Sequence, residues 1–119
     1  MGAWRRLWWL TGGCMVLAVV YFSLIPSPPE ADLPHWDKLN HLAAYAGLAW
    51  WFAQLGLART PVALALLALG GAVELAQGLI PSRQAGLADM GANVLGVGLG
   101  LALAARLPNA LLWLEARRA

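Results

Sequence analysis

The sequence predicts an all-α membrane protein, built as a bundle of four transmembrane helices with a short interfacial helix after them. The 119 residues are 61% hydrophobic and only 12% charged, and the mean hydropathy is +0.64. Four stretches approach the length of about 20 mostly apolar residues that a spanning helix needs. None of them shows the alternation of apolar and polar residues that is typical of a barrel strand.

The four apolar segments lie at about 7–25, 39–57, 61–80 and 87–107. They use most of the chain, so we expect residues 1–119 to form a single integral membrane domain. Residues 108–118 are amphipathic and predict the short C-terminal interfacial helix, with a role in anchoring.

The first apolar segment is expected to remain in the protein as an anchor. Arg5 and Arg6 precede it, as basic residues precede the core of a secretory signal. Its apolar run of about 19 residues is longer than the 7–15 residues usual for a signal core. Three prolines then end the segment without a small-x-small cleavage site, and they are Pro26, Pro28 and Pro29.

Short connections and basic residues predict how the segments cross the membrane. The links at 57–60 and 81–86 allow only tight turns, so the segments that they join should be antiparallel neighbours. Basic residues accumulate on the cytoplasmic side of membrane proteins. In this chain they are divided unequally between the two predicted sides of the membrane. We therefore expect a multi-pass protein of the bacterial cytoplasmic (inner) membrane with both termini in the cytoplasm. The cytoplasmic group is Arg5, Arg6, Arg59, Arg106, Arg117 and Arg118, and the outer group is Lys38 and Arg83.

Polar side chains inside the apolar part of the chain form the candidate site. A charged side chain costs about 2.5–3.5 kcal/mol at the centre of a membrane helix, so its presence suggests a role. These residues fall at the start of the second segment, the end of the third and the start of the fourth. The predicted topology places all three regions on the outer face. The candidate ligand-binding residues are Asp37, Lys38, His41, Tyr45, Glu74, Gln77, Arg83, Asp89 and Asn93.

Several of these residues also have a purely structural interpretation. Asp37 and Asp89 suit helix N-caps, and Lys38 and Arg83 suit interfacial anchors. Glu74 is the hardest to explain in this way, since a carboxylate inside the bilayer must be paired, neutralised or facing water.

Glycines recur near the polar residues and predict close helix packing. Gly70 and Gly71 lie one turn from Glu74 in the third segment. Gly96 and Gly100 form a small-xxx-small pair in the fourth segment, a pattern that lets two membrane helices approach closely. We expect the third and fourth segments to pack tightly against each other at these positions.

The order and spacing of these residues resemble the VanZ-like family. The resemblance covers about 37–100. Members of this family are small multispanning bacterial membrane proteins. The founding member is associated with resistance to teicoplanin, a glycopeptide that acts on cell-wall precursors at the outer face. The resemblance implies a role in the cell envelope and carries over the motif residues Asp37, Lys38, His41, Glu74, Gln77, Arg83, Asp89 and Asn93.

Three functions remain open at this level. The first is an envelope protein whose outer polar pocket recognises the headgroup of a membrane lipid, a lipid-linked cell-wall precursor or a glycopeptide, with a link to glycopeptide resistance. The second is an intramembrane enzyme acting on a lipid-linked substrate, with His41 as the acid or base. The third is a structural bundle that supports a partner protein. Whether the chain is an enzyme, and its oligomeric state, stay open.

No cofactor, metal or nucleic acid is expected. The spacings HxxxH and HExxH, which place two histidines on one helix face, are absent. The basic residues are spread over the segment ends, as membrane topology requires, and form no stripe for nucleic acid.

Overall fold

The computed structural model describes residues 2–25, 36–81 and 86–118. Within these ranges the protein is all-α, as predicted: 86% of the residues are helical, in five helices and no strand. The helices are α1 (Ala3–Leu24), α2 (Trp36–Gln54), α3 (Arg59–Gln77), α4 (Leu87–Arg106) and α5 (Ala110–Arg118).

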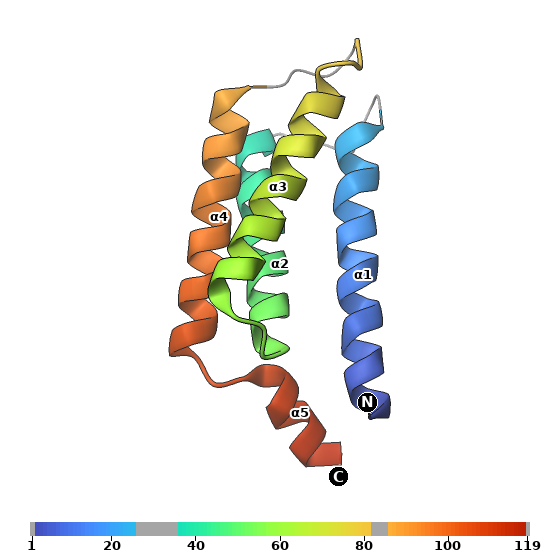
Figure 1. The fold of residues 1–119 in the computed structure, drawn as a ribbon, viewed down its shortest axis with the longest axis vertical. Coiled ribbons are helices and arrows are strands. Elements are labelled where there is room, and N and C mark those ends of the chain that lie inside the picture. The colour runs from blue at the N-terminus through green and yellow to red at the C-terminus, as the bar shows by residue number, and fades with distance from the viewer. Residues whose placement is uncertain (1, 26–35, 82–85, 119) are drawn as a thin grey trace.

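The four long helices lie roughly parallel to one axis and alternate in direction along the chain (Figure 1). Both ends of the chain therefore lie at one end of the molecule, here called the terminal end. The start of α2, the end of α3 and the start of α4 lie at the opposite end, here called the polar end. The molecule measures 50 × 28 × 24 Å, so it is elongated along the helices.

Helix ends follow from the local sequence at several points. Ile25 and Leu107 stop α1 and α4 in extended conformations, with ψ angles of 144° and 153°. Each precedes a proline, which disfavours the helical conformation in the residue before it. Between α2 and α3 the chain reverses at Gly56, whose φ of 86° is a conformation that glycine adopts without strain.

The closest packing in the bundle joins α2 to α4. A Cβ atom added to Gly96 would collide with the carbonyl oxygen of Leu42, and one added to Gly100 would collide with that of Ala46. The two glycines therefore let the backbones of α2 and α4 touch. For these two glycines the prediction that they bring the third and fourth segments together is wrong, because the atoms that they would meet belong to α2. Gly70 of α3 does face α4, since an added Cβ there would lie 2.8 Å from the Asn93 amide nitrogen.

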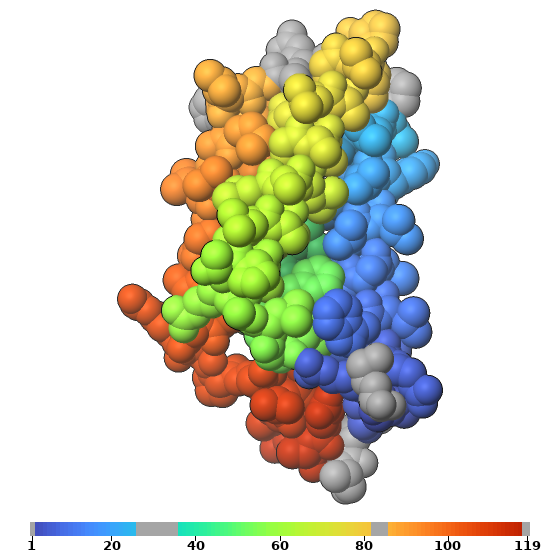
Figure 2. Space-filling view, in the orientation of Figure 1, coloured from blue at the N-terminus to red at the C-terminus, as the bar shows by residue number. Residues whose placement is uncertain are grey.

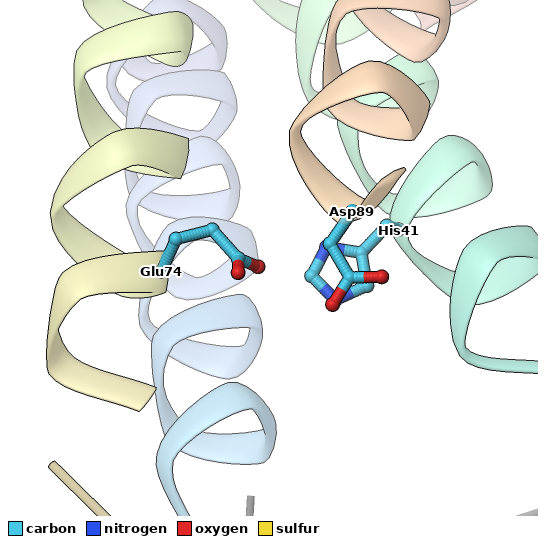
Figure 3. Close-up of side chains that lie close together, drawn as sticks. All are labelled: His41, Glu74 and Asp89. Carbon is cyan, nitrogen blue, oxygen red and sulfur yellow. The ribbon is translucent and has the colours of Figure 1, made fainter. Parts of the chain in front are cut away.

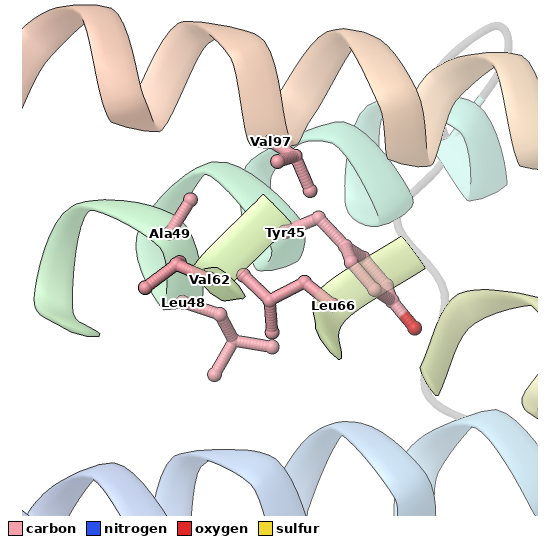
Figure 4. Packing of buried hydrophobic residues seen from close by; sticks show 6 residues of the cluster. All are labelled: Tyr45, Leu48, Ala49, Val62, Leu66 and Val97. Atoms are coloured by element: carbon pink, nitrogen blue, oxygen red, sulfur yellow. The ribbon is translucent and has the colours of Figure 1, made fainter. Parts of the chain in front are cut away.

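The apolar core lies where α2, α3 and α4 meet. Figure 4 shows Tyr45, Leu48 and Ala49 of α2 converging with residues of the other two helices. Val62 and Leu66 come from α3, and Val97 comes from α4. The Tyr45 ring packs in this core while its hydroxyl oxygen points away from the other five residues (Figure 4). Tyr45 thus connects the core to the polar end.

α1 is the least embedded of the long helices. Its buried residue is Gly12, where an added Cβ would lie 2.8 Å from the Phe52 ring of α2. Figure 2 shows α1 as a separate ridge beside α3, with part of α2 visible between them. An apolar cavity of about 510 Å³ lies there, and among the described residues none of the candidate polar side chains lines it. Its lining includes Trp9, Val16, Phe52, Val62, Leu66 and Leu69.

Hydrogen bonds hold α5 against the terminal end of the bundle. The buried Gln54 side chain accepts hydrogen bonds from the backbone of Ala110 at 2.7 Å and Leu111 at 3.4 Å. Asn109 donates to the carbonyl oxygen of Gln54 at 2.9 Å. The Trp8 indole of α1 donates to Glu115 at 2.6 Å. The predicted C-terminal helix therefore exists, and it packs on the bundle.

Three of the helices are long and apolar enough to cross a membrane, namely α1, α3 and α4. Their most apolar stretches have mean hydropathies of 1.7, 1.5 and 1.5. Large apolar side chains are exposed along their length, which is unfavourable in water and favourable in lipid. These features indicate a membrane protein.

The sequence predicted four spans, and α2 is the one that does not meet the same criterion. Its first two turns carry the polar residues Asp37, Lys38, Asn40 and His41, which lower its hydropathy. The helix is nevertheless 19 residues long, and it packs against the other three long helices.

Candidate functional site

The polar end gathers side chains from three helices. α2 contributes residues from its first three turns, α3 from its last turn and α4 from its first two turns. Spacings of three and four residues put the members from each helix on one face, so that they point toward a common region. The described members are Asp37, Lys38, His41, Tyr45, Glu74, Gln77, Asp89 and Asn93.

His41 and Asn93 form a hydrogen bond between α2 and α4. The distance from His41 Nδ1 to Asn93 Oδ1 is 2.8 Å, and Asn93 is fully buried. Because the amide oxygen only accepts, Nδ1 donates, and in the neutral ring Nε2 then holds a lone pair. The amide nitrogen of Asn93 contacts Met90 Sδ at 3.7 Å, which is consistent with this orientation of the amide.

Asp89 lies buried between His41 and Lys38. Its Oδ2 is 3.9 Å from His41 Nε2, and its Oδ1 is 3.5 Å from Lys38 Nζ. Asp89 is the third residue of α4, whose N-cap is Gly86, so the interpretation of Asp89 as the N-cap is wrong. Its carboxylate is available for contacts with other helices instead.

Lys38 and Asp37 form the exposed rim of the cluster. Lys38 Nζ is 3.3 Å from Asp37 Oδ2, and the two side chains are 42% and 67% exposed. Both precede the apolar run that begins at Leu39. A backbone hydrogen bond holds the pKa of Asp37 below its usual value, and Lys38 lowers it further. Asp37 lies in the first turn of α2, as its second residue.

Glu74 links α3 to the start of α4. Its Oε2 accepts a hydrogen bond of 3.0 Å from the backbone N–H of Gly86, the N-cap residue of α4. A carboxylate at a helix N-terminus is stabilised by the helix dipole and by the unpaired N–H groups there. Glu74 is also buried, so this contact helps to satisfy a charge that lies away from water.

Gln77 and Tyr45 lie at the edges of the cluster. The Gln77 amide donates to the carbonyl oxygen of Ser23 at 2.8 Å and thereby ties α3 to α1. The Tyr45 ring stacks parallel to His41, with ring centres 6.5 Å apart. Its hydroxyl is buried without a hydrogen-bond partner among the described residues.

Three ionisable side chains from three different helices face one another in the cluster. Figure 3 shows the Glu74 carboxylate extending from α3 toward the His41 ring and the Asp89 carboxylate. One ligand atom from each of the three lies within 4.8 Å of the others. One imidazole and two carboxylates at this distance can bind a metal ion or the cationic part of a ligand between them.

Two of the predictions fall on parts of the chain outside the described residues. Arg83 belongs to 82–85, so its place relative to Glu74 stays a prediction. Pro26, Pro28 and Pro29, which are expected to end the first apolar segment, also lie outside the described residues.

Gln54 and Asn109 are buried or partly buried polar residues that the sequence analysis missed. They serve α5 at the terminal end and take no part in the polar cluster. Two features of the sequence could have identified them. Gln54 ends the apolar run of α2, and Asn109 follows Pro108 directly before α5, where an asparagine is a typical N-cap.

Comparisons of the chain with protein-family models, with curated proteins and with solved structures find no match. The resemblance to the VanZ-like family therefore stays a prediction from the sequence.

Proposed function

We propose that the protein is an integral membrane protein in which α1 to α4 all cross the bilayer. Three of these helices are apolar enough to do so alone. α2 is proposed as the fourth span because its apolar remainder packs against α4 and its polar start lies at one end of the bundle. α5 would lie at the membrane surface, with Trp113 and Leu112 exposed to it.

The proposed location is the inner membrane of a bacterium, with the terminal end in the cytoplasm and the polar end on the outer face. The distribution of basic residues supports this orientation. Arg59 begins α3 and Arg106 ends α4 at the terminal end, and the start of α1 adds Arg5 and Arg6. Lys38 is the described basic residue at the polar end.

We further propose that the polar end recognises the headgroup of a membrane lipid or of a lipid-linked cell-wall precursor. The observation that supports this best is the buried cluster of His41, Asp89 and Asn93, covered at its rim by the half-exposed Lys38. An ammonium group binds a phosphate or carboxylate headgroup. The acyl chains of such a ligand would remain in lipid beside the apolar helices.

The resemblance to the VanZ-like family agrees with this proposal. It extends the proposal to cell-wall precursors and to glycopeptides such as teicoplanin, and glycopeptide resistance is the phenotype that it suggests. The enzyme alternative has less support, since Cys14, the single thiol of the chain and a potential nucleophile, is exposed on α1 and lies outside the cluster. The third alternative, a bundle that supports a partner protein, would use the contacts among Lys38, His41, Asp89 and Asn93 as an internal network, and the binding experiment distinguishes it from the proposal.

The proposal is tested by measuring binding of phosphatidylglycerol and undecaprenyl phosphate to the purified protein in nanodiscs. In Lys38→Gln we expect a loss of affinity of about tenfold, which corresponds to about 1.4 kcal/mol. The matched control is Arg106→Gln, which removes one exposed positive charge at the terminal end and should leave binding unchanged.

Equal affinities in wild type and Lys38→Gln would contradict the proposed role of the rim. Binding that is absent in all three proteins, while they remain folded, would favour the structural alternative. Release of a water-soluble product from the lipid, lost in His41→Gln, would instead favour the enzyme.

A further inference from the structure

We propose that His41, Glu74 and Asp89 bind a divalent transition-metal ion at the polar end. One ligand atom from each lies within 4.8 Å of the others, and each residue comes from a different helix. The side chains of His41 and Asp89 are 10% and 9% exposed, so the site is shielded from solvent. One imidazole nitrogen with two carboxylates is a ligand set that suits Zn²⁺ and related ions.

The distance between His41 Nε2 and Asp89 Oδ2 fits a shared ion better than a direct hydrogen bond. At 3.9 Å it exceeds hydrogen-bonding distance. Two ligands of a tetrahedral zinc ion, each about 2.1 Å from the metal, lie roughly 3.4 Å apart. For a shared zinc ion the Asp89 pair would close by about 0.5 Å and the widest pair by at most about 1.4 Å.

Each of the three ligands is also held by a second group. Asn93 accepts from His41 Nδ1 and so directs the lone pair of the ring to Nε2. Gly86 donates to Glu74 Oε2 at 3.0 Å. Lys38 lies 3.5 Å from Asp89 Oδ1, the oxygen that does not face the histidine. Outer contacts of this kind orient the ligands of metal sites.

Charge and polarity at the site also favour a cation. The described lysine beside the buried Asp89 is Lys38, which is 42% exposed and is shared with the exposed Asp37. A dication beside Asp89 would add positive charge next to this buried carboxylate. The Tyr45 ring stacks on His41, and its buried hydroxyl has no hydrogen-bond partner among the described residues.

Metal binding does not depend on the proposed recognition of a headgroup. If both hold, the open position of the ion would receive the phosphate or carboxylate of the headgroup. Only that last step rests on the proposed function.

The test uses the full-length, untagged protein in detergent micelles, stripped with a chelator and reloaded with Zn²⁺ alone. We expect about one zinc ion per chain after removal of the excess, measured by mass spectrometry of the metal. Reloading with Co²⁺ should produce visible absorption bands that report nitrogen and oxygen ligands.

Two matched pairs of variants locate the ion. Asp89→Asn should weaken zinc binding at least about tenfold, whereas Asp37→Asn removes an exposed carboxylate from the same end and should not. His41→Gln should likewise lose the ion, and His35→Gln controls for the second histidine of the chain. Melting temperatures of the metal-free proteins show which variants remain folded.

The inference is overturned if the wild type retains no zinc, or if Asp89→Asn and Asp37→Asn bind it equally well. If Asp89→Asn and His41→Gln lose zinc but bind lipid as the wild type does, the metal site is supported and its link to the headgroup is contradicted. Retained zinc with no lipid binding in any variant would contradict the proposed function alone.

Discussion

At His41 a single hydrogen bond decides which ring nitrogen is available for chemistry. Asn93 accepts from Nδ1 across the boundary between α2 and α4, which turns Nε2 toward Asp89. Gly70 makes room for this arrangement, since a Cβ there would lie 2.8 Å from the Asn93 amide nitrogen. The orientation of His41 thus depends on a small residue of α3 and an amide of α4.

Replacing Asn93 by leucine should destabilise the protein. The substitution leaves the Nδ1–H group of His41 without its acceptor in a largely buried place, at a cost of about 1–3 kcal/mol. The free energy of unfolding in mixed micelles, measured by circular dichroism against denaturant, checks this value.

The control is Asn40→Leu, because Asn40 is an exposed asparagine on α2. It should change the free energy of unfolding by less than about 0.5 kcal/mol. Equal destabilisation in the two variants would mean that the bond between His41 and Asn93 contributes nothing specific.

At the scale of elements, the contact between α2 and α4 organises the bundle. Gly96 and Gly100 present a flat strip to the carbonyl groups of α2. This close approach brings the polar starts of both helices together and sets the spacing between His41 and Asp89. A small-xxx-small pattern predicts that a helix will be approached closely, but it does not say by which neighbour.

Gly96→Ala should separate α2 from α4. The added methyl group collides with the Leu42 carbonyl oxygen, and backbone atoms cannot yield as a flexible side chain does. We expect a loss of about 1–3 kcal/mol in the free energy of unfolding, typical of overpacking.

Gly98→Ala provides the comparison on the same helix, since nothing lies within 4 Å of its added Cβ. It should be neutral or stabilising, because alanine favours helix by about 1 kcal/mol over glycine. A similar loss in both variants would contradict the role of the strip.

At the scale of the whole molecule, the protein has an apolar exterior and two chemically different ends. Exposed leucines such as Leu17, Leu75 and Leu95 lie on the outside of the three apolar helices. The polar end holds the buried ionisable cluster, and the terminal end holds both chain ends and the contacts of α5. The alternation of helix direction is what separates these two sets of residues.

The proposed orientation predicts which end can be labelled in whole cells. In a Cys14→Ser background, Asp37→Cys should react with a membrane-impermeant maleimide in intact cells, because Asp37 is exposed at the polar end. Arg59→Cys, at the terminal end, should react only after the membrane is opened. Mass spectrometry of the labelled protein measures both. The reverse pattern would place the polar end in the cytoplasm and would contradict recognition of an outer-leaflet headgroup.

The sequence alone determined the all-α class, the places of the long helices and the grouping of His41, Glu74 and Asp89 toward one end. These follow from hydropathy and helical spacing, which are local properties of the chain. The tertiary structure decided that α4 packs on α2, that Gln77 bonds to α1, and that one histidine and two carboxylates from three helices lie within 4.8 Å. No spacing along one helix encodes such a set, because its geometry arises only when three backbones pack at fixed distances.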